Sequence, residues 1–475
     1  MDIPPTPGPT RPDLRRPWSR SNRRLPRLVV RPLQAFLQAE ISSGVLLLAA
    51  AAAALAWANS PWAASYEAFW TQDLQLRLGS LQLSEDLRHW VNDGLMALFF
   101  FVAGLEIKRE VTTGDLSDRR AMAFPMVAAV GGMIVPALLY LAVNAGQVGQ
   151  DGWGIPMATD IAFALGVVAL VGRGLPSALR AFLLTLAIVD DIGAILVIAL
   201  VYTREVEAGA LLVAGALLGV VVVLRWLHVR FTPVYVLVGI GIWLAMLQSG
   251  VHATIAGVAL GLLTPARPFQ HPDPVSEIAR RVADETADDP DPPDADADHW
   301  LALAGLSREA VSPLVRLEHL LHPWTTRVII PVFALANAGV SLSGEGLAGA
   351  LSSSVVGGVV AGLVLGKPLG ITLAAWLGSR TGLLRIPPGV RWSHVVGVSA
   401  VAGVGFTVSL FIADLAFTEP ELAQAARTGI LAASVAAALL GAIVLGLTAR
   451  RRAAGDPDIE HGQAEPSEGM DPEGP

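Results

Sequence analysis

The chain has 475 residues, of which 53% are hydrophobic and only 16% are charged. This composition is typical of a protein that crosses a membrane several times. The absence of cysteine excludes disulfides, iron–sulfur clusters and thiol catalysis, and we expect no cofactor. The formal net charge of −8 averages acidic loops and basic segments, so the distribution of charge is more informative than its sum. Membrane orientation explains the arginine-rich start, and no nucleic-acid partner is expected.

Residues 1–31 are rich in proline and arginine and have no apolar periodicity, which predicts a disordered tail. The apolar stretch at 36–58 is long enough to stay in the membrane, so we expect no cleavage there. Alternating residues at 74–83, around Gly79-Ser80, then predict a short β-hairpin on the membrane surface.

Eleven further apolar spans follow, at about 90–107, 121–144, 154–172, 180–202, 208–224, 232–248, 250–265, 323–341, 352–378, 394–416 and 424–448. The sequence therefore predicts an all-α polytopic membrane protein with about twelve transmembrane helices and both termini on one side. Basic residues concentrate in the loops on the side of the termini, and the positive-inside rule makes that side cytoplasmic. We expect a multi-pass protein of the cell (plasma) membrane.

The predicted transmembrane domain, 32–452, contains an acidic insert at 267–312 and is followed by a second disordered cytoplasmic tail at 453–475. The insert has a composition that cannot bury a core, so it is predicted to be a solvated cytoplasmic linker with a surface helix at about 299–315. Two spans are interrupted near mid-depth, at Met157–Ala162 (MATDIA) and Ala402–Ser409 (AGVGFTVS). Such interruptions are typical of discontinuous helices in the two halves of an inverted repeat.

Few ionisable residues are predicted to lie deep in the membrane, namely Asp160, Asp190, Asp191 and Lys367. Each carboxylate at such a position costs at least ~2.5 kcal/mol on insertion scales. Three acids and one base leave two negative charges uncompensated at neutral pH, which favours a bound cation or bound protons. A single site that holds either, but not both, couples the two in a cation/proton antiporter.

Asp190 and Asp191 point about 100° apart around an α-helix, so one can face a water-filled cavity while the other faces a neighbouring helix. Lys367 is the obvious partner, either in a static salt bridge or as a proton carrier. Pro368 frees the carbonyl of Val364, and the glycines that flank Lys367 allow close approach of another helix. The residues alone do not decide which aspartate pairs with the lysine.

Thr159 and Asp160 offer a hydroxyl and a carboxylate at a predicted helix break. Together with Asp191 and unwound backbone they would supply the oxygen ligands that a hard monovalent cation requires. Two roles remain open for Asp160, which are direct ion contact and compensation of the dipole ends of two broken helices.

Charged residues near the predicted cytoplasmic end could sense pH, because histidine titrates near neutrality; they are Glu106, Lys108, Arg109, Glu318, His319 and His322. Ordinary surface pairing is the alternative, and His252 lies near the opposite face. Two other functions are considered. An intramembrane aspartyl protease would normally take its aspartates from two helices, and no Gly-x-Gly-Asp is present. A passive cation channel would need no buried lysine–aspartate pair.

Six motifs resemble the NhaA-type sodium/proton antiporters, from about residue 36 to 450: Phe100–Glu110 (FFVAGLEIKRE), Ala158–Gly166 (ATDIAFALG), Ile188–Ala194 (IVDDIGA), Gly250–Thr254 (GVHAT), Arg316–Trp324 (RLEHLLHPW) and Gly366–Gly370 (GKPLG). The resemblance implies exchange of Na⁺ or Li⁺ for H⁺ by a homodimer, and a core of two inverted three-helix repeats whose broken helices cross. The resemblance therefore predicts a transporter and not an enzyme.

The resemblance also implies roles for single residues. Asp191 would be the main ligand for Na⁺ or Li⁺ and for protons, with Asp190 and Thr159 as further ligands. Asp190 would also pair with Lys367 and exchange protons in the transport cycle. Thr159 and Asp160 would lie at the helix crossing. The pH response would involve Glu106, Glu318, His319 and His252. The acidic insert, the extended tails and Asp414 depart from the family pattern, without touching the six motifs.

Overall fold

The computed structural model describes residues 40–78, 81–114, 119–171, 176–203, 206–287, 297–342, 352–382 and 386–453, together with the single residues 349 and 384. The predicted tails lie outside the described residues, except for Ala453. Within these ranges the chain is almost entirely helical, and its strands form a single two-stranded sheet.

The elements follow the predicted apolar spans closely. In chain order they are α2 (Glu40–Ala58), α3 (Ala63–Trp70), β1 (Asp73–Leu78), β2 (Leu81–Asp86), α4 (Leu87–His89), η3 (Trp90–Leu95), α5 (Met96–Thr112), α6 (Arg119–Asn144), η5 (Val148–Met157), α7 (Ile161–Val171), α8 (Ser177–Val201), α9 (Ala208–Trp226), α10 (Thr232–Gln248), α11 (Thr254–Leu263), α12 (Pro272–Ala287), α13 (Ala297–Glu309), α14 (Pro313–Trp324), η6 (Thr325–Ile329), α15 (Ile330–Asn337), α17 (Ser354–Val360), η7 (Ala361–Gly366), α18 (Lys367–Arg380), α19 (Trp392–Val401), α20 (Phe406–Ala416) and α21 (Pro420–Ala453).

Six helices in the described ranges are long and apolar enough to cross a membrane, and up to nine spans result if each bent pair of helices counts as one. The bent pairs are α2 with α3 (116°), η5 with α7 (49°) and α19 with α20 (48°). The last two bends coincide with the predicted interruptions, which confirms that these helices are discontinuous. The protein is therefore a multi-pass, all-α membrane protein, and the full count of twelve helices and the inverted repeats stay predictions.

The site-bearing helix α18 is shaped by proline and glycine. The π-helical turn η7 ends directly before Lys367-Pro368, as expected where proline cannot donate a backbone hydrogen bond. The backbones of α6 and α18 touch, since a Cβ built on Gly370 would lie 2.2 Å from the carbonyl oxygen of Gly131. Glycine at this position therefore lets α18 approach α6 and brings Lys367 into the interior.

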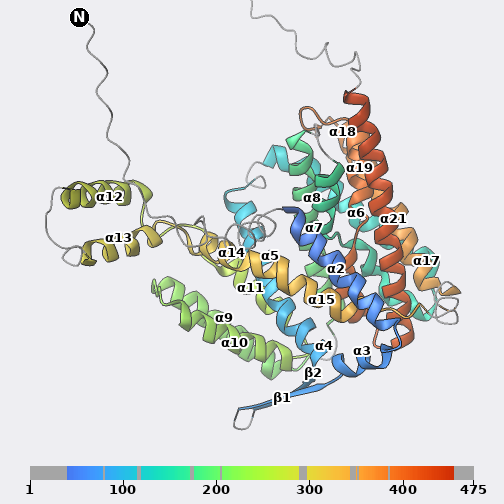
Figure 1. Cartoon of the computed structure of the whole chain (residues 1–475), viewed down its shortest axis with the longest axis horizontal. Coiled ribbons are helices and arrows are strands. Elements are labelled where there is room, and N and C mark those ends of the chain that lie inside the picture. The colour runs from blue at the N-terminus through green and yellow to red at the C-terminus, as the bar shows by residue number, and fades with distance from the viewer. Residues whose placement is uncertain are drawn as a thin grey trace, which may run out of the picture.

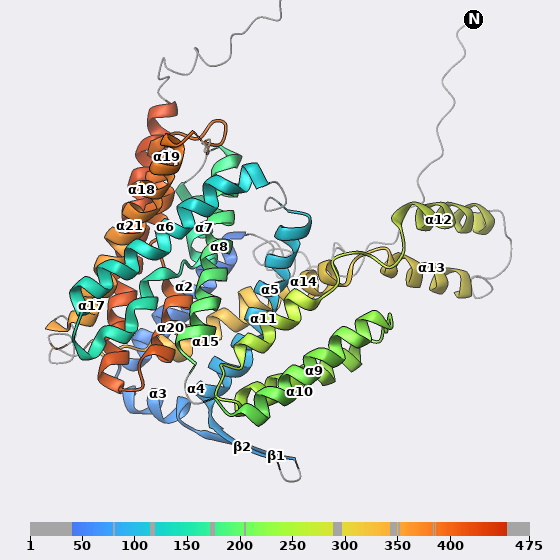
Figure 2. The ribbon, with the colours of Figure 1, turned by 180° about the vertical axis from the view of Figure 1, so that it is seen from behind.

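The predicted β-hairpin is present, with Leu76 opposite Leu83, while its turn at Gly79-Ser80 lies outside the described residues. It projects from one end of the helical body, and the C-terminal end of α21 lies at the other (Figures 1 and 2). The long helices α9 and α10 run side by side at the edge of the body (Figure 1).

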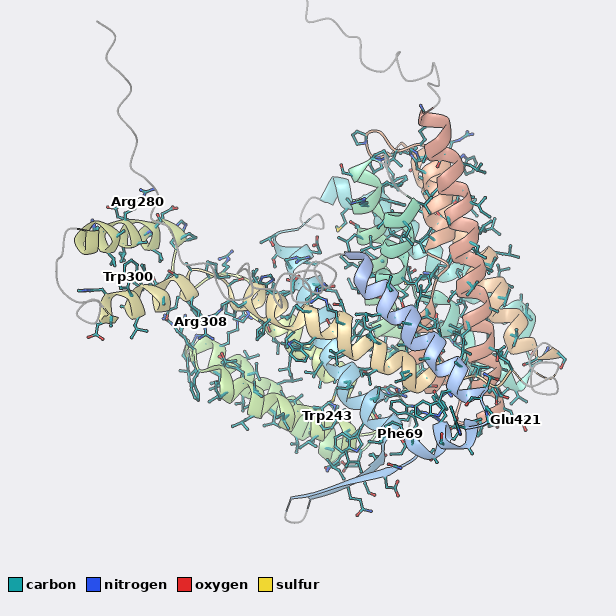
Figure 3. The ribbon with its side chains drawn as sticks, viewed as in Figure 1. Phe69, Trp243, Arg280, Trp300, Arg308 and Glu421 are labelled. Atoms are coloured by element: carbon teal, nitrogen blue, oxygen red, sulfur yellow. The ribbon has the colours of Figure 1, made fainter. Side chains whose placement is uncertain are left out.

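The insert differs from the predicted linker, because it contains two helices, α12 and α13, that pack against each other. Val275 and Val282 of α12 are buried, since their helical spacing creates a small apolar stripe that overall composition concealed. The surface helix predicted at about 299–315 is present, but its predicted C-terminal end was wrong. α13 stops at Glu309, and Ser312 caps the next helix, α14. Trp300 of α13 lies far from the helical body (Figure 3), whereas Glu309 at the other end of α13 pairs with Arg230, which lies between α9 and α10.

Candidate ion and proton site

The four deep ionisable residues come from three elements that meet inside the helical body. Asp190 and Asp191 lie in the middle of α8, Asp160 lies in the break between η5 and α7, and Lys367 is the first residue of α18. All four side chains belong to residues that are buried. The second break, between α19 and α20, supplies backbone and hydroxyl partners to this group.

Lys367 contacts Asp190, and both side chains are completely buried. The ammonium nitrogen Nζ of Lys367 forms an ion pair with Oδ2 of Asp190 and also donates a hydrogen bond of 2.9 Å to Oγ1 of Thr159. The Thr159 hydroxyl lies 2.7 Å from Oδ2 of Asp190 and 2.9 Å from the carbonyl oxygen of Ala402. The structure thus assigns Asp190, rather than Asp191, to the lysine.

Asp191 has a different environment from Asp190, because its carboxylate forms no ion pair within the described residues. The residue is 9% exposed, and its buried Oδ1 atom lacks a hydrogen-bond partner. No group of three His, Cys, Asp or Glu side chains in the described ranges could hold a metal ion. A cation at Asp191 would therefore need further oxygens from hydroxyls, carbonyls or water. The predicted ligand Thr159 is already engaged by Lys367 and Asp190.

Asp160 links the two helix breaks. Its Oδ1 accepts a hydrogen bond of 2.9 Å from the backbone N–H of Phe163 at the start of α7. Its Oδ2 accepts bonds from the N–H and the hydroxyl of Thr407 at the start of α20, at 3.1 and 2.7 Å. A carboxylate at two helix N-termini satisfies free donors and opposes both dipoles. Of the two roles considered for Asp160, this geometry favours compensation of the helix ends.

The predicted pH-sensing cluster forms in part, between α5 and α14. Arg109 pairs with Glu318, and Nδ1 of His322 lies 3.2 Å from Oε1 of Glu106.

Other members of the predicted set are placed elsewhere. Lys108 donates a hydrogen bond to the carbonyl oxygen of Leu262 and not to an acidic side chain of the cluster. His319 is exposed. Nε2 of His252 lies 2.9 Å from the carbonyl oxygen of Tyr202, just beyond the end of α8. His252 therefore contacts a different part of the chain from the α5–α14 cluster.

Two groups of this cluster on α14 have shifted acidities. The hydrogen bond to Glu106 raises the pKa of His322 above its ordinary 6.5. Burial raises the pKa of Glu318 above its ordinary value, although Arg109 opposes that shift. A rise in pH therefore removes the proton from His322 and ionises Glu318, so both changes add negative charge to the cluster.

Sequence reasoning missed Thr407 as the partner of Asp160, as well as a polar network formed by Asn92, Asn337, Asp414 and Arg427. A hydroxyl directly after the glycine-rich break was a usable signal for Thr407. Arg427 lies inside α21, near the predicted start of its span, where an arginine is easily read as a flanking charge.

Two interrupted helices that meet at buried carboxylates are the architecture of secondary transporters. Comparison with known proteins agrees, because the family model described as "Na+/H+ antiporter 1" matches residues 34–445. The chain therefore belongs to this antiporter family.

Relatives named for the same activity cover nearly the whole chain. A protein named Na(+)/H(+) antiporter NhaA 3, from Frankia alni, is 47% identical and covers 90% of this chain and 91% of its own length. Na(+)/H(+) antiporter NhaA from Oleidesulfovibrio alaskensis is 46% identical, and the match covers 89% of this chain and 95% of the relative. Na(+)/H(+) antiporter NhaA 2 from Sorangium cellulosum is 47% identical, with 94% and 96% covered.

Replacing Thr407 by valine should destabilise the contact between the two helix breaks, because it removes the hydroxyl donor to Asp160 while preserving the shape of the side chain. We expect a loss of about 1.5–3 kcal/mol, as for a hydrogen bond to a charged group. Thermal unfolding of the purified protein measures it. Thr428→Val is the matched control, since this hydroxyl donates only to the carbonyl of Gln424 within α21. Equal unfolding temperatures for the two variants would contradict the assignment.

The contact between His322 and Glu106 should stabilise the protein in a pH-dependent way. Because the folded-state pKa of His322 is raised, the stabilisation is fully present below about 6.5 and is lost as pH rises through the raised value. His322→Gln should therefore lower the unfolding temperature on the acid side of 6.5 and have little effect well above it. His319→Gln, at an exposed histidine, should show no such dependence. A pH-independent effect of His322→Gln would refute the contact.

Proposed function

We propose that the chain exports Na⁺ or Li⁺ in exchange for external protons by alternating access at a single carboxylate site in the middle of the membrane. The observation that carries the proposal is the buried, unpaired carboxylate of Asp191 beside the Lys367–Asp190 ion pair. The printed names of the relatives, all Na⁺/H⁺ antiporters, support the same exchange.

Asp191 is the proposed exchanging ligand. An isolated carboxylate in a buried position is costly unless a proton neutralises it or a cation compensates it. Because a proton and a cation cannot occupy this carboxylate at the same time, binding of Na⁺ expels the proton, and protonation expels Na⁺. Oxygen ligands suit both alkali cations, and the ligands beyond Asp191 would come from nearby hydroxyls, unwound backbone and water.

Asp190 and Lys367 have a second role in the proposal. Their ion pair stabilises the carboxylate form of Asp190 inside the protein, and a proton that reached Asp190 would release the lysine. The Thr159 hydroxyl, which contacts both groups, orients them. The pair therefore carries part of the proton exchange, in addition to positioning α18 against α8.

The remaining parts of the proposal concern location, assembly and regulation. The protein is placed in the plasma membrane with both termini in the cytoplasm, as a homodimer, in keeping with the charge distribution and the family. Regulation by pH is assigned to the cluster between α5 and α14, because His322 and Glu318 both lie there and each loses a proton, and so becomes more negative, as pH rises.

Neither alternative function gains support from the site. The two adjacent aspartates lie on one helix, and Lys367 binds one of them, whereas an aspartyl protease needs two carboxyls that share a proton. A passive channel has no need for a buried ion pair between helices. Coupling of the cation to the proton is therefore the property to test.

Asp191→Asn should abolish Na⁺/H⁺ exchange, because an amide cannot alternate between a proton and a cation. Purified protein in liposomes with a preset pH gradient and a fluorescent pH probe measures this. The wild type should dissipate the gradient on addition of Na⁺, and its apparent Na⁺ affinity should fall as pH falls. Glu421→Gln, at an exposed acid near the start of α21 (Figure 3), is the matched control and should behave like wild type. Wild-type exchange by Asp191→Asn would disprove the site.

A further inference from the structure

A polar network lies at the end of the helical body from which the β-hairpin projects. Its four side chains come from four elements: Asn92 from η3, Asn337 from the end of α15, Asp414 from α20 and Arg427 from α21. The neighbouring Trp90 donates to the carbonyl of Leu74 in strand β1, which places the network next to the hairpin. The side chains of Asp414 and Arg427 are only 12% and 17% exposed.

The network consists of two pairs. In the first, Oδ1 of Asp414 accepts hydrogen bonds from Nε and Nη2 of Arg427, at 3.2 and 2.6 Å, which joins the consecutive helices α20 and α21. In the second, Nδ2 of Asn337 donates to Oδ1 of Asn92 at 2.8 Å, which joins α15 to η3. Among the described residues one hydrogen bond connects the pairs, from Nδ2 of Asn92 to Oδ2 of Asp414, at 3.1 Å.

Apolar residues fill the same boundary one helical turn away. The ring of Phe411 in α20 lies 5.3 Å from that of Phe100 in α5 and 6.3 Å from that of Phe333 in α15. Aromatic contacts of this kind have no strict direction and persist during small displacements, whereas a hydrogen bond is lost within about 1 Å of movement. The hydrogen bond between Asn92 and Asp414 is therefore the contact at this boundary that breaks when the helices move apart, while the aromatic contacts persist.

The boundary is connected to the ion site through α20. Thr407 at the start of this helix holds the carboxylate of Asp160, and Asp414 stands two turns later near its end. Displacement of α20 relative to η3 and α15 would thus act on the crossing of the broken helices and break the bond between Asn92 and Asp414 in the same movement.

We propose that Asn92 and Asp414 form a latch that holds α20 and α21 against η3 and α15 and favours the conformation in which the hairpin end of this boundary is closed. The latch rests on the proposed function, since alternating access requires the boundary to open in part of the transport cycle. Loss of the latch increases the fraction of molecules in which the hairpin end is open.

Asn92→Asp is the sharpest substitution for a test. It replaces the donor Nδ2 by an oxygen that faces the Asp414 carboxylate, and it retains Oδ1 as the acceptor for Asn337. Asn92→Ala removes the donor without adding a charge and serves as the second variant if the first does not fold. Asn59→Asp is the matched control, because Nδ2 of Asn59 donates to the carbonyl oxygens of Leu55 and Val340, outside the α20 boundary.

The natural absence of cysteine allows a single reporter, Leu415→Cys, at a partly buried position beside Asp414. A membrane-impermeant maleimide is added to each face of reconstituted vesicles in turn, and the labelling rate is measured. At the face that carries the hairpin, Asn92→Asp should label roughly tenfold faster than the reporter alone, as expected for loss of one hydrogen bond to a charged group. Asn92→Ala should change in the same direction, and Asn59→Asp should label at the rate of the reporter alone.

Equal labelling rates for the reporter alone and for a folded Asn92 variant would overturn the latch. Labelling requires no ion flux, so Na⁺/H⁺ exchange by the chain without cysteine is measured separately. Faster labelling of the Asn92 variants in a protein that performs no exchange would support the latch while the proposed function fails. Exchange with unchanged labelling would reject the latch alone.

Discussion

The arrangement of the site depends on the ion pair between Lys367 and Asp190, both fully buried. Removal of one member of such a pair leaves an uncompensated charge and typically costs about 3–5 kcal/mol. Several features of the chain serve this contact. The π-helical turn and Pro368 shape the start of α18, Gly370 lets that helix touch α6, and the break before α7 brings the Thr159 hydroxyl to both charges. With Asp190 neutralised in this way, Asp191 is left as the carboxylate that must find a partner from solution.

Asp160 solves a different problem at nearly the same place. Two interrupted helices leave unsatisfied backbone donors inside the protein, where each would be expensive. One carboxylate receives donors from both helices and so fixes their relative position. The site thus contains three carboxylates in three environments: one paired with a lysine, one bound by helix N-termini and one free. This difference in environment allows chemically identical groups to carry different functions.

Much of this arrangement could be predicted from the sequence, because buried charge is rare and its partners are few. The broken helices, the hairpin and a buried pair between Lys367 and one of the two adjacent aspartates follow from hydropathy, from glycine and proline positions and from charge balance. Thr159 was predicted as a cation ligand together with Asp191, and its contact with Asp190 and Lys367 was not foreseen. The choice between Asp190 and Asp191 could not be made from the residues alone, since helix geometry separates the two but does not orient α8. The helices of the insert were missed because the two buried valines of α12, Val275 and Val282, lie seven residues or about two helical turns apart in an acidic segment that conceals their pattern. The network at Asp414 was also missed, because its members are distant in sequence and its two asparagines carry no charge.

The central claim is that one carboxylate holds either protons or an alkali cation. Its most direct test is proton release on Na⁺ binding by the purified protein in weakly buffered solution, scanned from acid to alkaline pH. The account predicts that Na⁺ releases protons from the wild type, that Li⁺ does the same, and that Asp191→Asn releases none. Binding of Na⁺ without proton release at every pH, or equal release by Asp191→Asn, would contradict it.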